Sequence, residues 1–408
     1  MLMVKPNAKT GCLIVSAVFA PEPIVSAKLS KELAVALAEK HDVTVVRPLP
    51  SRPFGFVIGS GVLEVYPFQL ITLASYIYPK SHLFGRLRES YSFGKSTAAF
   101  ISDNHDEIKV VYVNTWPLLA QVLTVWSAKK YNLPVILHVQ DIYPESLVSK
   151  LGLIGHLVSY LLRPLDSWLL RNSTKVVAIS DKMKDYLSST RKLKPSSLEV
   201  LSNWQDETEF LNFNEIPEVP EALRAFTFMY LGNIGPVAGC DLLIDAFASL
   251  KADNCRLIIA GSGSMKNDLL EKTIKNNLKN IVFISVPDGN VPQTQAVADV
   301  LLLPIKKGAA SSSIPSKLPA YMFSAKPIIS SVDYYSDTAE AIRNANCGWI
   351  VEPDNAGALK DIMQKALNLT EEERGSMGLK GRDYALQHFS KKNNLPKLVR
   401  IIEELVER

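Results

Sequence analysis

The sequence is short of the residues that build metal centres and disulfide scaffolds. Its four cysteines, Cys12, Cys240, Cys255 and Cys347, form no CxxC pair, and no histidine stands at metal-ligand spacing from any of them. This pattern argues against a structural zinc site and against a secreted disulfide framework, and it fits a reducing compartment.

Charge of one sign and long apolar runs are also scarce. The 408 residues carry 45 Lys and Arg against 41 Asp and Glu, a net charge of +4, which disfavours a nucleic-acid binder that relies on a strong global field. The most apolar early stretch, residues 12–20, ends at Pro21 and is much shorter than the roughly 20 residues of a spanning helix. It partly resembles a signal peptide, but its removal would delete the first predicted strand. The sequence predicts a cytoplasmic protein that could still contact the inner face of the membrane.

Short β-branched runs alternate with amphipathic stretches along the whole chain. The predicted strands lie at 13–18, 43–46, 110–113, 135–139 and 175–179, and after Trp204 at 227–230, 256–259, 281–284, 300–303, 327–329 and 348–351. Helical patterns separate them, for example at 29–40, 117–131, 153–170, 241–249, 265–277 and 317–323. Apolar strands separated by helices indicate parallel sheets covered on both faces. The prediction is an α/β fold of two doubly wound, Rossmann-like domains with an interdomain cleft.

The expected domain boundary lies near residue 205, where the stretch 205–220 lacks periodicity and is predicted to be a linker. We place the N-terminal domain at residues 1–204 and the C-terminal domain at 205–385. Residues 386–408 are left as a terminal helix that could return to the N-terminal domain.

Three glycine-containing turns follow strands of the C-terminal domain. They cover residues 232–236, 260–264 and 306–317, and the last holds four serines and three lysines. Doubly wound sheets bind ligands beyond the carboxyl ends of their strands, so three such turns predict an anion site. None of the turns matches GxGxxG or GxxxxGK[ST], which disfavours a dinucleotide or P-loop site. The candidate ligands are Asn233, Gly235, Gly261, Gly263, Lys306, Lys307, Ser312, Ser313, Ser316 and Lys317.

The third turn carries the most specific prediction. Ser313 is expected to cap a helix whose early Pro315 gives up no needed N–H. The N–H groups of that first turn, together with Lys317, would grip a diphosphate. The alternative is a set of solvated lysines beside an ordinary helix cap.

The polar cluster of the N-terminal domain follows the strand at 135–139. His138, Asp141 and Glu145 are placed there for general-base or charge-stabilising work. The alternatives are a buried core position for His138 and a helix N-terminal charge for Glu145. Pro21 and Glu22 occupy the matching place after the first strand.

These motifs resemble the retaining glycosyltransferases of GT-B fold, family 4. The resemblance covers nearly the whole chain and is carried best by residues 232–235, 258–263, 298–304 and 315–329. Residues 138–145 and 21–23 resemble a subgroup that builds bacterial surface polysaccharides from nucleotide-linked N-acetylamino sugars. The resemblance implies an acceptor on the N-terminal domain and a nucleotide sugar on the C-terminal domain. It also implies no metal requirement, no cofactor other than the nucleotide-sugar donor, and a last helix that crosses back.

The sequence departs from this family at four positions. The two Glu that the family carries eight positions apart are replaced by Ser312 and Ala320, and its Arg and Lys fall at Asn233 and Ala238. The resemblance therefore implies that the diphosphate depends on Lys317, on Lys306 or Lys307, on Gly235 and on helix N–H groups.

The implied reaction is retaining transfer of an N-acetylamino sugar from a UDP-sugar to a polyprenyl-diphosphate-linked or other glycan acceptor. One alternative is a catalytically impaired GT-B subunit that only binds the nucleotide sugar. The other is a GT-B UDP-sugar 2-epimerase, which the few acidic residues near 306–317 disfavour.

The segment Tyr76–Lys95 mixes aromatic residues with four basic ones against a single Glu89. This composition suits a surface that touches anionic lipid headgroups. The alternative is a solvated loop and helix that contribute some core residues.

Overall fold

The computed structural model describes residues 11–52, 65–78, 83–114, 117–212, 225–250, 252, 254–287, 289–308 and 314–407. The chain divides into two compact units. The N-terminal unit comprises Met1–Asn203 with Asn394–Arg408, and the C-terminal unit comprises Trp204–Asn393.

The N-terminal unit is built on a parallel sheet of seven strands in the order β3-β2-β1-β4-β5-β6-β7. The strands are β1 Cys12–Val15, β2 Val43–Arg47, β3 Gln69–Thr72, β4 Val110–Asn114, β5 Val135–Val139, β6 Lys175–Ala178 and β7 Leu198–Val200. The helices are α1 Val25–Ala38, α2 Leu83–Asn104, α3 Leu118–Lys130, α4 Val148–Asn172 and α5 Asp181–Arg191, with 3-10 turns at η1 Glu145–Leu147 and η2 Pro195–Ser197. The chain order reverses between β1 and β4, so this sheet has its switch point there.

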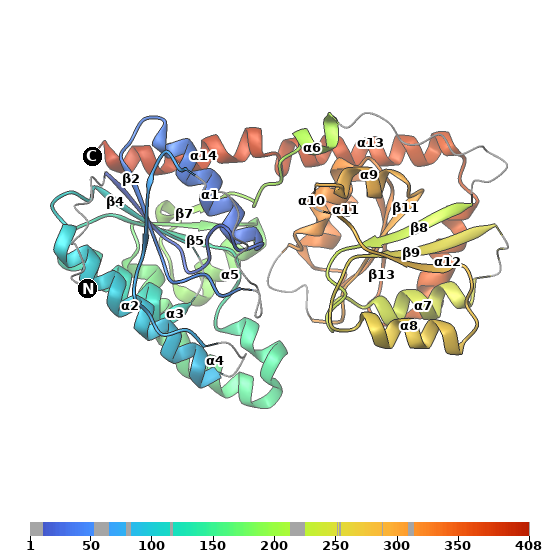
Figure 1. Cartoon of the computed structure of the whole chain (residues 1–408), viewed down its shortest axis with the longest axis horizontal. Helices are drawn as coiled ribbons and strands as arrows, with labels where there is room; N and C mark the ends of the chain where they lie inside the picture. Colours follow the sequence, from blue (N-terminus) through green and yellow to red (C-terminus); the bar gives the residue numbers. More distant parts are fainter. Residues whose placement is uncertain are drawn as a thin grey trace. The chain divides into compact units, whose positions relative to one another are not determined.

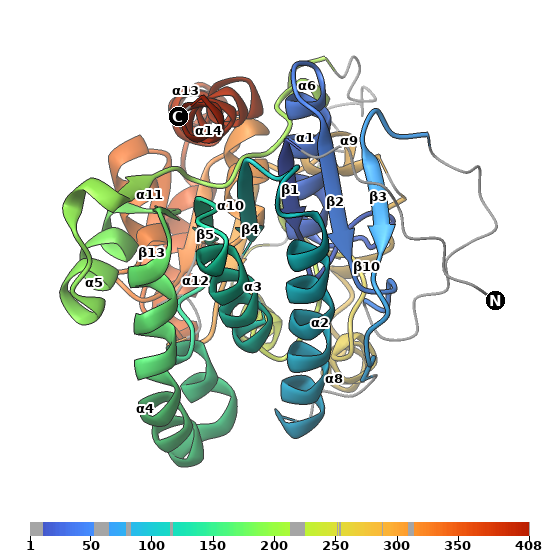
Figure 2. The ribbon, with the colours of Figure 1, turned by 90° about the vertical axis from the view of Figure 1, so that its left-hand side faces the viewer.

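Helices cover both faces of this sheet (Figures 1 and 2). Alternate strand residues such as Leu13, Val111 and Leu137 enter one core together with residues of α2, α3, α4 and α5. The intervening residues point to the opposite face, because side chains alternate along a strand. Helix α1 lies over that face, with Leu29, Leu33 and Leu37 among its buried residues. The apolar strands thus gain two covering layers, as their composition predicts.

The C-terminal unit contains a parallel sheet of six strands in the order β10-β9-β8-β11-β12-β13. These strands are β8 Phe226–Leu231, β9 Cys255–Ala260, β10 Ile281–Ile284, β11 Val300–Pro304, β12 Ile328–Ser331 and β13 Gly348–Val351. The helices are α6 Thr208–Leu211, α7 Cys240–Ala248, α8 Lys266–Lys275, α9 Val291–Ala296, α10 Lys317–Phe323, α11 Asp337–Ala345, α12 Ala356–Leu367 and α13 Glu371–His388. The last helix, α14 Lys391–Val406, begins in this unit, and its residues from Asn394 onward belong to the N-terminal unit. The switch point of this sheet lies between β8 and β11.

Two cores hold the second sheet, one on each face. Phe228, Leu257 and Leu302 pack with residues of α7, α8 and α12, while Met229 and Leu301 pack with α10, α11 and α13. The two parallel sheets with helices on both faces confirm the predicted α/β fold of two doubly wound, Rossmann-like domains.

Residues 205–212 do not behave as a linker. The carboxylate of Glu207 is buried and accepts hydrogen bonds from the Ser390 hydroxyl at 2.5 Å and from the Lys391 backbone N–H at 2.9 Å. Phe210 is buried in the core beside Phe323. A carboxylate at the first turn of α14 compensates the backbone N–H groups that have no partner inside a helix, so this short stretch is anchored by charge and burial. The remainder, 213–220, lies outside the described residues.

Candidate functional site

The candidate anion site of the C-terminal unit lies at the switch point, beyond the ends of β8 and β11. Lys317, the first residue of α10, is half-buried there, and its Nζ donates to the Tyr230 hydroxyl at 2.8 Å. That hydroxyl donates in turn to the carbonyl of Asn233 at 2.6 Å. Burial lowers the pKa of Lys317 from its ordinary value. The ammonium group is thus held at a fixed place beside the first glycine turn.

The glycines of the first two turns have a structural reason to lack a side chain. A Cβ on Gly261 would lie 2.1 Å from the carbonyl oxygen of Gly232, and one on Gly263 would lie 2.3 Å from that of Ile234. Backbone hydrogen bonds join the same turns, from Gly232 N to Ala260 O and from Ile234 N to Ser262 O. The two turns therefore pack directly on each other, and their glycines make this close approach possible.

The Lys317 side chain completes this arrangement. Its Cε would lie 1.9 Å from a Cβ on Gly232, where the φ angle is +152°. The lysine stem thus rests on the bare backbone of the first turn. The structure brings Gly261, Gly263, Asn233 and Lys317 together, and the two glycines contact protein backbone. Their predicted role in donor binding stays a prediction.

The other predicted donor ligands are spread around this centre. Lys306 Nζ lies 3.4 Å from an Asp241 carboxylate oxygen, Lys307 is exposed, and Gly235 is buried. Ser316 is exposed and occupies the N-cap position of α10, but its side chain makes no capping hydrogen bond. The predicted cap at Ser313 is therefore wrong in position, because α10 begins only at Lys317. Ser312 and Ser313 themselves lie outside the described residues.

Two of the four positions that depart from the family pattern lie in the hydrophobic cores of this unit. Ala238 and Ala320 are both buried, each in one of the two hydrophobic cores of this unit. Small side chains fit there because each core is packed on both sides by neighbouring elements. A longer charged side chain at either position would need the surrounding residues to move.

At the switch point of the N-terminal unit, the predicted residue Glu22 organises the first βα turn. Its buried carboxylate accepts backbone hydrogen bonds from Phe19 at 3.0 Å and from Ser51 and Arg52 at 2.7 Å each. The neighbouring Pro21 is exposed. Glu22 therefore ties the turn after β1 to the segment after β2, and a carboxylate suits this task because it can accept several donors at once.

His138 sits inside the sheet. Its ring has no exposed surface, and Nδ1 lies 2.8 Å from the buried hydroxyl of Tyr112 on the adjacent strand β4. Burial lowers the pKa of His138 to about 4 because the charged form loses hydration. The imidazole is consequently neutral at physiological pH. Its predicted catalytic role stays a prediction, while the core position is the environment that the structure gives it.

Asp141 lies just past the end of β5 and is half-buried. Its Oδ1 oxygen is buried and accepts no hydrogen bond from any residue that the structure describes. The preceding Gln140 accepts a hydrogen bond from the Ser26 hydroxyl at 2.7 Å, which joins this loop to α1. Of the predicted polar cluster, Asp141 is the member that presents an unused acceptor.

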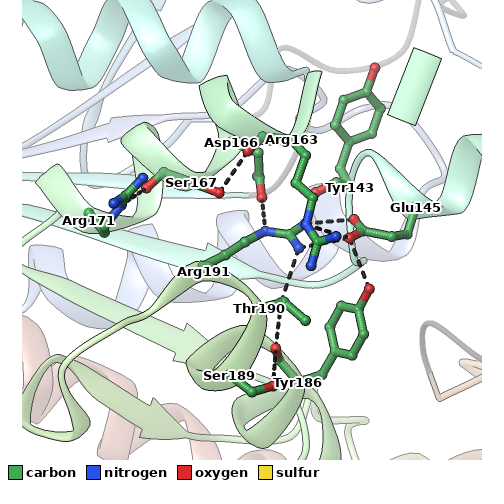
Figure 3. Close-up of polar contacts among 10 residues, drawn as sticks. All are labelled: Tyr143, Glu145, Arg163, Asp166, Ser167, Arg171, Tyr186, Ser189, Thr190 and Arg191. Atoms are coloured by element: carbon green, nitrogen blue, oxygen red, sulfur yellow. Dashed lines mark hydrogen bonds and ion pairs between the residues drawn. The ribbon is translucent and has the colours of Figure 1, made fainter. Parts of the chain in front are cut away.

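Glu145 is held in an ion-pair cluster (Figure 3). Both of its oxygens accept from the Arg191 guanidinium, at 2.7 and 2.6 Å, and the Tyr186 hydroxyl donates at 2.9 Å. Nε of Arg191 donates to Asp166 at 2.7 Å. Burial raises the pKa of Asp166 to about 6. Burial also acts to raise the pKa of Glu145, but the hydrogen bonds and charge of Arg191 outweigh it and hold that pKa below its ordinary value.

Sequence reasoning missed the residues that hold these sites. Arg191, 1% exposed, lies on α5 and is far in the sequence from Glu145, and Tyr230 lies on β8, far in the sequence from Lys317. No spacing rule connects them, because contacts between elements depend on how the sheet is assembled. A basic residue inside an otherwise apolar helix face was the only available signal.

The segment from Tyr76 to Lys95 forms the start of α2 and the residues before it, apart from 79–82, which are not described. Arg88 lies over the Tyr76 ring at 4.2 Å, and Glu89 accepts from Arg52 at 2.6 Å and Arg86 at 3.0 Å. The described part of the chain contains no cluster of three potential metal-ligating side chains. Likewise, none of the helices in that part is both apolar and long enough to cross a bilayer.

Comparison with known proteins gives similar descriptions for both units. The model for "Glycosyl transferases group 1" matches residues 212–384, and that for "Glycosyl transferase 4-like domain" matches residues 27–204. The chain is 24% identical over 281 residues to the probable glycosyltransferase WbjE of Pseudomonas aeruginosa, covering 66% of this chain and 68% of that protein. It is also 24% identical to the putative colanic acid biosynthesis glycosyl transferase WcaI of Escherichia coli, over 67% of this chain and 68% of the relative.

Among solved structures, the chain resembles Anabaena HepE in complex with UDP. The TM-score is 0.70 at 14% identity, and the match covers 97% of this chain and 100% of that one. At this identity the likeness concerns the fold.

Proposed function

Because this chain belongs to the GT-B glycosyltransferases of family 4, we propose that it transfers an N-acetylamino sugar, with retention, from a UDP-sugar to a polyprenyl-diphosphate-linked or other glycan acceptor. The UDP complex of the Anabaena neighbour supports the donor class. The name of the Escherichia coli relative supports a role in polysaccharide biosynthesis. In this proposal the C-terminal unit binds the donor and the N-terminal unit the acceptor.

The observation that carries the donor proposal is the placement of Lys317 at the switch point. Its ammonium group is oriented by Tyr230 and its stem lies on Gly232, so the charge needs little reorganisation to meet a departing diphosphate. Fixed charge directed at the oxygen atoms that become negative in the transition state is the largest common source of rate enhancement. Lys306 and Lys307 add positive charge on the neighbouring turn.

On the acceptor side, Asp141 is the residue we assign to the acceptor hydroxyl, because its Oδ1 accepts no hydrogen bond from a described residue. His138, which precedes it on β5, has no exposed surface, and we assign it to positioning. Glu145 and Glu22 hold the two loops that border this edge of the sheet.

The donor proposal is tested with Lys317→Ala assayed for transfer across a panel of UDP-, GDP- and ADP-sugars. We expect kcat/KM to fall about 100-fold, or about 2.7 kcal/mol of transition-state stabilisation. Lys275→Ala, which removes an exposed lysine from α8, is the matched control and should retain wild-type activity. Activity of Lys317→Ala within about twofold of wild type would refute the assigned role.

The same panel separates the alternatives. Thermal stabilisation by UDP without transfer to any acceptor would favour the catalytically impaired binding subunit, for which the buried Ala238 and Ala320 are the structural argument. Conversion of a UDP-sugar into its 2-epimer without an acceptor would identify the epimerase.

A further inference from the structure

Arg191 uses all five N–H donors of its guanidinium within the N-terminal unit (Figure 3). Nη1 donates to Oε1 of Glu145 at 2.7 Å and to the Thr190 hydroxyl at 3.1 Å. Nη2 donates to Oε2 of Glu145 at 2.6 Å and to the Tyr143 carbonyl at 3.3 Å. Nε donates to Asp166 at 2.7 Å. Because an arginine has five such donors, the guanidinium is fixed in one orientation.

Two of these acceptors lie on the segment after β5 that carries Asp141. The carbonyl of Tyr143 is two residues beyond Asp141 in the sequence, and Glu145 is four residues beyond it. At the other end of the segment, the Ser26 hydroxyl donates to the Gln140 side chain, directly before Asp141, at 2.7 Å. The guanidinium on α5 and the serine hydroxyl on α1 therefore hold the segment on both sides of Asp141.

Asp141 needs this support because one of its oxygens is buried without a partner. Oδ1 accepts no hydrogen bond from any residue that the structure describes. A buried oxygen of this kind loses hydration without compensation, so the side chain would turn toward water if the main chain around it were free to move. The oxygen is thus available to a ligand only while the segment is held in place.

We infer that Arg191 is a positioning residue for the proposed reaction, because it fixes the main chain around Asp141 so that Oδ1 meets the acceptor hydroxyl. The inference rests on the proposed function in one respect, namely that Asp141 contacts the acceptor. Arg191 itself is 1% exposed and is out of reach of a substrate, so its effect on transfer passes through Asp141. The effect can be large, since displacement of a reacting group by about 1 Å can cost about 100-fold in rate.

The test is a double-mutant cycle of Arg191→Lys and Asp141→Asn, assayed for transfer to a glycan acceptor. Lysine keeps the positive charge but has only three donors on one nitrogen, so it cannot reach Glu145, Asp166 and the Tyr143 carbonyl together. We expect Arg191→Lys to lower kcat at least about 10-fold and to leave UDP-induced thermal stabilisation unchanged. In the Asp141→Asn background it should have little further effect, because contributions that pass through one residue are not additive.

Arg171→Lys controls for the substitution itself, since Arg171 is exposed on helix α4 and should leave kcat unchanged. Circular dichroism checks that each variant folds, and rates are measured at a temperature where all variants are folded. An equal fractional loss of activity from Arg191→Lys in both backgrounds would overturn the inference, because a general loss of structure acts alike on each.

Hydrogen exchange supplies a readout that requires no transfer. In Arg191→Lys the peptide covering residues 140–146 should exchange at least about 10-fold faster, while the β1 peptide, which monitors the unit as a whole, should change less. Unchanged exchange of residues 140–146 would overturn the inference whatever the activity. Wild-type transfer by Asp141→Asn would refute the acceptor assignment and the inference with it. A wild-type protein that transfers no sugar would refute the proposed function, while faster exchange would still support the hold of Arg191 on the segment.

Discussion

Replacing Arg191 with methionine should destabilise the N-terminal unit more than any surface substitution in it. The guanidinium has no exposed surface, and it donates to both oxygens of Glu145 and to Asp166 at 2.6 to 2.7 Å (Figure 3). Methionine fills a similar volume but leaves two carboxylates without their cation. Removal of one partner from a buried ion pair costs about 3–5 kcal/mol. The Glu145 side chain is 24% exposed and can regain water, so we expect about 3 kcal/mol.

The loss of stability caused by Arg191→Met should depend on pH, and the pKa of Asp166 gives its direction. Burial already raises the pKa of Asp166 to about 6, and removal of Arg191 takes away the charge that lowers it. A carboxyl whose pKa is higher in the folded state than in the unfolded state binds more protons when folded, so its contribution to stability falls as pH rises through the folded pKa. The variant should therefore be closer to wild type at pH 5 than at pH 8.

Hydrogen exchange of the β5 and β6 peptides is a suitable assay, because it reports this unit separately from the other. Arg171→Met is the matched control, since Arg171 is exposed on α4 and its Nε donates to the backbone carbonyl of Ser167. Replacement of all three charges, with Arg191→Met, Asp166→Asn and Glu145→Gln, should recover most of the loss. A deficit below about 1 kcal/mol for Arg191→Met, or a triple variant as unstable as the single one, would refute the reasoning.

Two further predictions follow from buried groups. Because burial lowers the pKa of His138 to about 4, its contribution to the free energy of unfolding should be complete above pH 6.5 and should decrease by about 3 kcal/mol as pH falls to 4. His138→Gln should flatten this decrease. An unchanged pH dependence of hydrogen exchange in the variant would count against the prediction. Gly261→Ala should lower the melting temperature and weaken UDP-induced stabilisation, because its Cβ would lie 2.1 Å from the Gly232 carbonyl oxygen. Gly375→Ala, with open space in helix α13, should instead be neutral or stabilising by up to about 1 kcal/mol, and similar melting temperatures for the two variants would contradict the close-approach argument.

The central strands and the helix at Lys317–Phe323 were predictable because their signal is local. β5 and β10 are reproduced with the predicted bounds, since each is a short apolar run ended by polar or turn residues. The edge strand β3 and the long helix α2 were not predicted. β3 is partly exposed and lacks a buried pattern, and α2 has a mixed composition that only its packing against α3 makes helical.

The candidate site likewise combines features with a local sequence signal and features that depend on packing. The sequence by itself determined that glycine turns and lysines follow the strands of the C-terminal unit, and that His138, Asp141 and Glu145 follow β5. Only the tertiary structure decided what each of them does. Strand alternation turns His138 into the sheet, while the fold brings Arg191 from a distant helix onto Glu145.

The scarcity of cysteine and of net charge disfavours structural zinc sites, disulfide frameworks and nucleic-acid binders that rely on a strong global field. Composition could not show which charged side chains are buried or held by partners. Whether a lysine is solvated or held over a bare glycine backbone, as Lys317 is, depends on the approach of two turns that are about 85 residues apart in sequence. Local propensity specifies the strands and helices, but the strength of a charge depends on burial and partners, which are set by long-range packing.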